Sequence, residues 1–300
     1  MKKILKWIGI VLGSLIGLLL VVVTVMFLMG ESRFNKTYEF PPSDIVLPTD
    51  EASLELGKHR VESLCAGCHG PDLGGVENWF DSPPLGIIDS ANLTSGKGGI
   101  GTTYTDQDFV SAIRHGIDSQ GKPIFMPAVV ATAYLSNEEL GAIIAYIRTL
   151  PPVDRELKGE RLSPVAKILL TAGMLGDLPV EIVPHETQIT APLAGASVEY
   201  GKYMVDTHDC RVCHGPNLNG GPFPDPTIPV ISPNITPGGS IANWTEQDFI
   251  NTIRTGIKPD GYGMNPSLMP WKDHAKFYDH ELQAIYIYLK SLDALPQYTK

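Results

Sequence analysis

The feature that most constrains the fold of this chain is an internal repeat that covers most of its length. Six short blocks of sequence recur in the same order. One of them is Thr105–Phe109, which returns as Thr245–Phe249. The offset between matching blocks drifts by only a few residues, so insertions are small and fall in loops. A repeat of this kind indicates two copies of one domain rather than a single larger core.

Each copy has the hydrophobic spacing of helices and lacks the sustained alternation of a sheet, which predicts an all-α fold. A middle helix is expected to begin at Thr105, with Asp108 placed to complete a capping box. A last helix is expected from about Ser136. Gly57 and Gly201 fall inside expected helices, where glycine costs about 1 kcal/mol relative to alanine. Their recurrence indicates a close helix crossing.

The repeat and the segments outside it divide the chain into five parts. They are a transmembrane anchor at 1–30, a tether at 31–50, a first domain at 51–152, an interdomain linker at 153–196 and a second domain at 197–300. The linker contains an apolar patch, Val165–Met174, which is too short to cross a bilayer. We expect it to form a helix that packs against one or both domains.

The beginning of the chain predicts a single membrane-spanning helix. Trp7–Met29 has no charged residue, and a helix rising about 1.5 Å per residue crosses the ~30 Å hydrocarbon core over such a length. Lys2, Lys3 and Lys6 precede it and should stay cytoplasmic. The remainder is then expected on the periplasmic side of the inner membrane. A cleaved secretory signal is the alternative, although its apolar region is normally ~7–15 residues and ends at small residues.

All four cysteines lie in two identical motifs, each of which ends in histidine. The spacing C-x-x-C-H is the signature of c-type haem attachment, because two thiols at this separation add to the two haem vinyl groups. The histidine that follows is placed over the iron. Zinc and thioredoxin-like dithiol sites are alternatives, but zinc pairs normally lie ~15–20 residues apart and the dithiol needs a βαβ context. The sequence predicts two haem c groups bound at Cys65, Cys68 and His69, and at Cys210, Cys213 and His214.

Each copy also offers a sixth ligand for iron. Met126 and Met269 each precede a proline, at matching distances before the last helix. A lone methionine in a loop is usually a packing residue, but paired positions in two haem-bearing copies favour iron ligation. Met264 is a rival in the second copy and lacks the following proline. The predicted metal ligands are therefore His69 with Met126 and His214 with Met269, and no catalytic residue is predicted.

Several other polar residues recur, and their roles stay open. Arg114 and Arg254 could pair with haem propionates or could anchor the glycine turn that follows each of them. Asn92 and Asn234 each begin an N-x-T triplet, which suggests a shared structural role near the haem rather than glycosylation. The remaining histidines have no counterparts and are expected mostly at the surface: His59, His115, His185, His208, His274 and His280.

Together these blocks resemble cytochrome c domains of the small soluble type. The arrangement is similar to the multihaem cytochrome c subunits of periplasmic alcohol and aldehyde dehydrogenases. The resemblance implies an electron carrier, not an enzyme, that connects a dehydrogenase or quinol-oxidising complex to a downstream acceptor such as a terminal oxidase. The formal net charge of −10 argues against nucleic acid as a partner. The alternative is a dihaem enzyme such as a peroxidase with one open iron site, although the near-equal ligand spacing in the two copies disfavours it.

Overall fold

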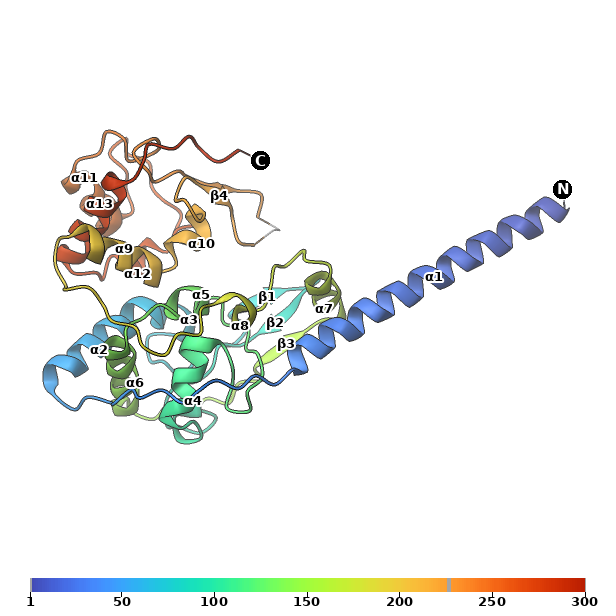
Figure 1. Cartoon of the computed structure of the whole chain (residues 1–300), viewed down its shortest axis with the longest axis horizontal. Coiled ribbons are helices and arrows are strands. Elements are labelled where there is room, and N and C mark those ends of the chain that lie inside the picture. The colour runs from blue at the N-terminus through green and yellow to red at the C-terminus, as the bar shows by residue number, and fades with distance from the viewer. Residues whose placement is uncertain (1, 226–227, 300) are drawn as a thin grey trace.

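A long N-terminal helix leads into two groups of short helices (Figure 1). The computed structural model describes residues 2–225 and 228–299. The first group contains α2 (Glu51–Leu64), α3 (Ala66–His69), the 3-10 turn Ile100–Thr102, α4 (Asp106–Val110), a π-helical turn at Ser111–His115, α5 (Val129–Thr132) and α6 (Asn137–Thr149). The second contains α9 (Val198–Thr207), α10 (Cys210–His214), α11 (Glu246–Thr255), α12 (Trp271–His274) and α13 (Asp279–Ser291). Between the groups lie α7 (Pro164–Thr171) and α8 (Pro179–Ile182).

The same helix pair forms the centre of each group. α2 packs against α6 and α9 against α13, and a glycine lies at each crossing. A Cβ atom on Gly57 would lie 2.0 Å from the Ala142 carbonyl oxygen, and one on Gly201 would lie 2.0 Å from that of Ala284. Only glycine permits this approach of two backbones, so the predicted close crossing is confirmed in both copies.

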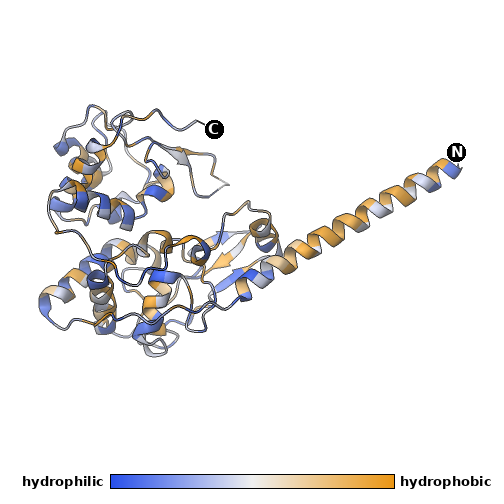
Figure 2. Ribbon diagram, in the orientation of Figure 1, coloured by the Kyte–Doolittle hydropathy of each residue, from blue (hydrophilic) through white to orange (hydrophobic). Residues whose placement is uncertain are grey.

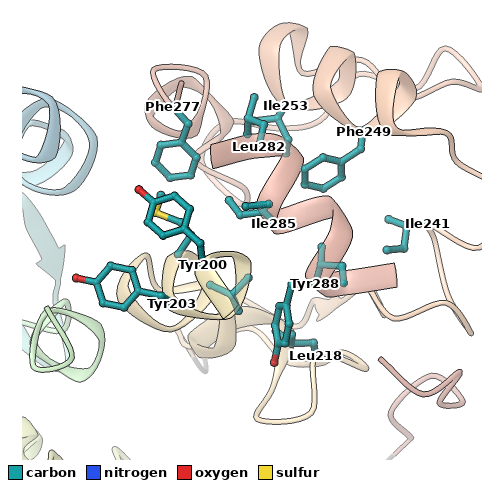
Figure 3. Close-up of a cluster of buried hydrophobic side chains, with 14 residues drawn as sticks. Tyr200, Tyr203, Leu218, Ile241, Phe249, Ile253, Phe277, Leu282, Ile285 and Tyr288 are labelled. Carbon is teal, nitrogen blue, oxygen red and sulfur yellow. The ribbon is translucent and has the colours of Figure 1, made fainter. Parts of the chain in front are cut away.

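Each group encloses its own hydrophobic core. In the first, Phe109, Leu140, Ile143 and Ile144 are among the buried side chains. In the second, Phe249, Leu282, Ile285 and Tyr288 converge between α9, α11 and α13 (Figure 3). The helix starts follow the sequence signals, because Thr105–Asp108 and Thr245–Asp248 both form capping boxes.

The structure adds short strands that the hydrophobic periodicity did not indicate. β1 (Phe80–Ser82), β2 (Gly86–Ile88) and β3 (Glu160–Leu162) form an antiparallel sheet, and β4 (Gly221–Pro222) pairs with β5 (Ile231–Ser232). Strands of two or three residues are too short for alternation to be recognised. Because β3 pairs with β2, residues 160–162 extend the first group of helices by one strand.

The N-terminal helix α1 (Lys2–Asn35) projects away from the rest of the molecule (Figure 1). Its surface is apolar over most of its length (Figure 2). Among the residues that the structure describes, it is the one helix long and apolar enough to cross a membrane. Its large apolar side chains are exposed.

Candidate haem-binding sites and the contact between them

The two C-x-x-C-H motifs occupy equivalent short helices directly after the first helix of each group. The first motif begins at Cys65, which ends α2, and forms α3, and the second forms α10. Each motif stops at a glycine with left-handed backbone, Gly70 at φ 80° and Gly215 at φ 78°. This conformation strongly favours glycine and turns the chain sharply away after the histidine.

Both motif histidines are oriented by a backbone carbonyl. His69 Nδ1 lies 2.7 Å from the Ala91 carbonyl oxygen, and His214 Nδ1 lies 2.8 Å from that of Pro233. A carbonyl only accepts, so Nδ1 carries the proton and Nε2 retains its lone pair. Burial lowers the pKa of both imidazoles, which favours the neutral, metal-binding form. This is how a ligating histidine is normally held, and the residues present therefore fit a haem iron.

The recurring N-x-T triplets hold those two carbonyls in place. Asn92 directly follows Ala91, and its side-chain oxygen accepts hydrogen bonds from the Thr94 amide (3.0 Å) and hydroxyl (2.8 Å). Its amide nitrogen donates to the Val153 carbonyl at 2.7 Å. Asn234 repeats the arrangement with Thr236 and with the Leu295 carbonyl. The triplets are thus structural turns that position the partner of each histidine.

The predicted methionines lie in equivalent loops and are partly buried. Met126 packs against the buried cluster of Val129, Ala133 and Val183, and Met269 packs against the core of the second group. The rival, Met264, occupies a different place. Its amide donates to the Gly256 carbonyl as Ile124 does to Gly116, so Met264 corresponds to an isoleucine of the first copy.

The recurring arginines bind backbone rather than remaining free. Arg114 is fully buried and donates to the Leu135 carbonyl at 2.9 Å, just before α6. Arg254 donates to the Ala275 carbonyl and, at 2.7 Å, to Asp279 at the start of α13. Both arginines therefore tie the middle helix to the start of the last one. This supports the structural alternative for these two residues.

The expectation that the remaining histidines lie mostly at the surface is wrong for three of them. His59, His115 and His208 are each at most 5% exposed. His115 and His185 approach within 3.1 Å through their Nδ1 atoms, and both rings stack on Phe40. Because histidine is intermediate in its tendency to be buried, the sequence alone does not show which of these side chains lie inside the protein.

A buried polar cluster joins the two groups of helices, and sequence reasoning missed it. Arg60 of α2 donates to Glu139 of α6 at 2.8 Å, to Glu281 of α13 at 2.6 Å and to the Tyr200 hydroxyl of α9 at 3.0 Å. His59 lies 2.8 Å from Glu281. We name these residues, together with Tyr203, the interdomain cluster; each is at most 8% exposed.

The interdomain cluster has approximate two-fold symmetry. Glu139 and Glu281 are equivalent in the repeat, and so are His59 and Tyr203. The Tyr203 hydroxyl reaches across to Glu139, and His59 reaches across to Glu281. Arg60 breaks the symmetry, since it contacts both carboxylates alone. The recurring glutamates were the available signal, but their position near a helix start indicated only capping.

The first haem motif lies against the second group of helices. Lys276 Nζ donates to the Glu62 carbonyl at 2.8 Å, and a Cβ atom on Gly67 would lie 2.8 Å from an Asp273 carboxylate oxygen. Burial raises the pKa of the Cys68 thiol to about 11, with further contributions from the charges of Asp209 and Asp273. The first haem motif and the helix before it therefore contact the loop and helix around Asp273 and Lys276.

Acid should weaken this interface. Burial of Glu281 opposes its ionisation, but the hydrogen bond with His59 and the charge of Arg60 lower its pKa to about 2. The resulting stabilisation is complete above the unfolded pKa of ~4.5 and is lost as the pH falls toward 2. We expect a loss of up to about 3 kcal/mol over this window, measured as the free energy of unfolding in urea. Glu281→Gln should lose less over the same window, and an equal loss in both proteins would contradict the assignment.

Comparison with known proteins agrees with this geometry. A family model described as cytochrome C oxidase, cbb3-type, subunit III matches residues 52–147, and one described as cytochrome c matches residues 198–293. The chain therefore contains two cytochrome c domains, a class of protein that binds haem c and transfers electrons.

Curated relatives extend the likeness over most of the chain. The fructose dehydrogenase cytochrome subunit of Gluconobacter japonicus is 28% identical over 303 residues, covering 90% of this chain and 58% of the relative. The alcohol dehydrogenase (quinone) cytochrome c subunit of Gluconobacter oxydans (strain 621H) is 26% identical, covering 83% and 56%. The gluconate 2-dehydrogenase cytochrome c subunit of Pantoea cypripedii is 25% identical, covering 82% and 60%. The chain spans little more than half the length of these relatives.

Proposed function

We propose that this chain is a membrane-anchored dihaem electron carrier in which electrons pass between the two cytochrome c domains. The observation that supports this most directly is the packing of the first haem motif against the second domain at Asp273 and Lys276. A haem c bound in each domain would supply an iron that alternates between its ferric and ferrous states. The protein's contribution is to hold the two attachment sites close and fixed.

The proposed iron ligands are His69 with Met126 and His214 with Met269. Two features support the histidines, namely the Nδ1 hydrogen bond and the burial of the ring. The methionines are supported by their equivalent loops and by the match of Met264 to Ile124 rather than to Met126. A methionine and a histidine bound to the same iron would raise its potential and would leave no coordination site for a substrate, as a carrier requires.

The proposed partners follow from the relatives, which are named as cytochrome subunits of dehydrogenases. The electron donor would be a dehydrogenase or a quinol-oxidising complex, and the acceptor a downstream protein such as a terminal oxidase. We place both domains on the periplasmic side of the inner membrane, held by α1. Contacts between the end of α1 and the rest of the chain support a retained anchor, because Gly30 packs directly against the backbone of Lys167.

The visible spectrum of the reduced, haem-loaded protein tests this function. With two protein ligands on each iron, adding carbon monoxide should leave the spectrum unchanged. A shift in about half of the haem would show that one iron is open. That result would contradict the carrier and favour a dihaem enzyme such as a peroxidase.

A further inference from the structure

A helical hairpin in the segment between the two domains lies alongside the end of α1. The Thr171 hydroxyl of α7 donates to the Met26 carbonyl at 2.9 Å, and four residues earlier Lys167 lies against Gly30. Residue numbers increase along α7 in the direction in which they decrease along α1, so the two helices are antiparallel. α7 therefore descends along α1 from the domain side toward the apolar part of that helix (Figure 1).

Ion pairs mark the level at which this descent begins. Lys167 pairs with Glu31, and Arg33 pairs with Asp177 at 2.9 Å and with Glu181. Residues 168–176, between the first and the last turn of the hairpin, contain no charged side chain. Thr171 is level with Met26, and Met26 lies five helical steps before Glu31. At about 1.5 Å per residue, this part of the hairpin lies ~7 Å beyond the ion pairs.

The end of the hairpin is a compact turn with an exposed apolar side chain. Gly173 has left-handed backbone, and its amide donates to the Leu170 carbonyl at 3.0 Å. The Met174 amide donates to the Leu169 carbonyl at 2.9 Å, which completes a Schellman motif. These two hydrogen bonds satisfy the amides of Gly173 and Met174 within the turn itself. Met174 is 66% exposed.

We propose that residues 168–176, the hairpin tip, insert into the lipid bilayer beside α1 as a second membrane contact. The proposal rests on the anchor role of α1 proposed above. We propose lipid as the surroundings of the tip because the tip lies against the apolar part of α1. The ion pairs of Glu31 and Arg33 lie where both the tip and the apolar part of α1 end. Two points of attachment would fix the tilt of the first domain against the membrane, which a single helix leaves free.

Spin labelling of the full haem-loaded chain in lipid nanodiscs tests the tip. All four native cysteines are bound to haem in the loaded protein, so the spin label attaches only to the introduced cysteine. We expect a nitroxide at Met174→Cys to be relaxed by oxygen, which concentrates in lipid, at least threefold more effectively than by a water-soluble nickel chelate. Leu193→Cys, at a side chain that is 92% exposed in the segment before the second domain, should show the reverse preference.

A third label, Leu19→Cys in the middle of α1, separates failure of the tip from failure of the anchor. If oxygen relaxes the label at Leu19 more effectively but the nickel chelate relaxes the label at Met174 more effectively, only the proposal for the tip is overturned. Nickel exposure at both positions would overturn the anchor as well. A Met174 label that neither reagent reaches would show that protein, such as a second copy, covers the tip, which also overturns the proposal. None of these outcomes depends on the carbon monoxide test of the electron-transfer function.

Discussion

Replacing Arg60 by methionine should lower the free energy of unfolding of the haem-loaded protein by about 3–5 kcal/mol. The substitution removes the guanidinium that pairs with both Glu139 and Glu281 and leaves these two buried carboxylates without it. Methionine is the residue at the matching position of the second domain, where Met204 is fully buried. The side chain itself is therefore compatible with a core in this fold. Urea denaturation followed by the haem spectrum measures the effect.

The loss of stability in Arg60→Met should come from the uncompensated charge of the two glutamates rather than from the shape of the methionine side chain. A triple variant that adds Glu139→Gln and Glu281→Gln to Arg60→Met should recover a large part of the lost stability. Lys58→Ala, which removes an exposed ion pair with Glu55, should change stability by at most ~1 kcal/mol. If Arg60→Met unfolds like the parent protein, the interdomain cluster does not stabilise the contact between the domains. Electron exchange between the two haems should also slow in Arg60→Met, because the attachment sites are no longer held together.

Replacing Met126 or Met269 by alanine should open one iron while leaving the other unchanged. Each variant should bind carbon monoxide at about half of its haem. The midpoint potential of that haem should fall by on the order of 0.1 V or more, within the ~0.8 V range that axial ligands cover. A redox titration with the spectrum recorded at each step measures both effects.

Met264→Ala is the matched control for this pair. It removes a methionine from the same loop as Met269 and should alter neither carbon monoxide binding nor potential. If Met264→Ala opens the second iron and Met269→Ala does not, the ligand of the second domain is Met264. If neither substitution has an effect, the second iron has a different sixth ligand.

Features that depend on residues close in sequence could be predicted. The haem motifs, the capping boxes and the two glycine crossings each follow from a local pattern, and the repeat showed that these patterns occur twice. The all-α class also follows, apart from strands too short to leave a periodic signal. The N-x-T triplets were identified as structural, but their connection to the histidines required the geometry of the loops.

Contacts between distant segments could not be predicted. Arg60 is separated from Glu139 by 79 residues and from Glu281 by 221. An arginine in an amphipathic helix is normally solvated, so nothing local indicates that this one is buried. The same holds for the hairpin tip, because the apolar patch of the linker was expected to pack against one or both domains, whereas the helix that it forms, α7, packs mainly against α1.

The single arginine of the interdomain cluster has an evolutionary consequence. In a symmetric pair of identical one-domain proteins, any residue near the two-fold axis would be present twice. Two arginines would bring a second buried positive charge, and two methionines would leave both glutamates without a counter-ion. Joining two copies in one gene removes this constraint, because each copy can then mutate alone. Arg60 opposite Met204 is therefore an arrangement that two identical copies could not adopt.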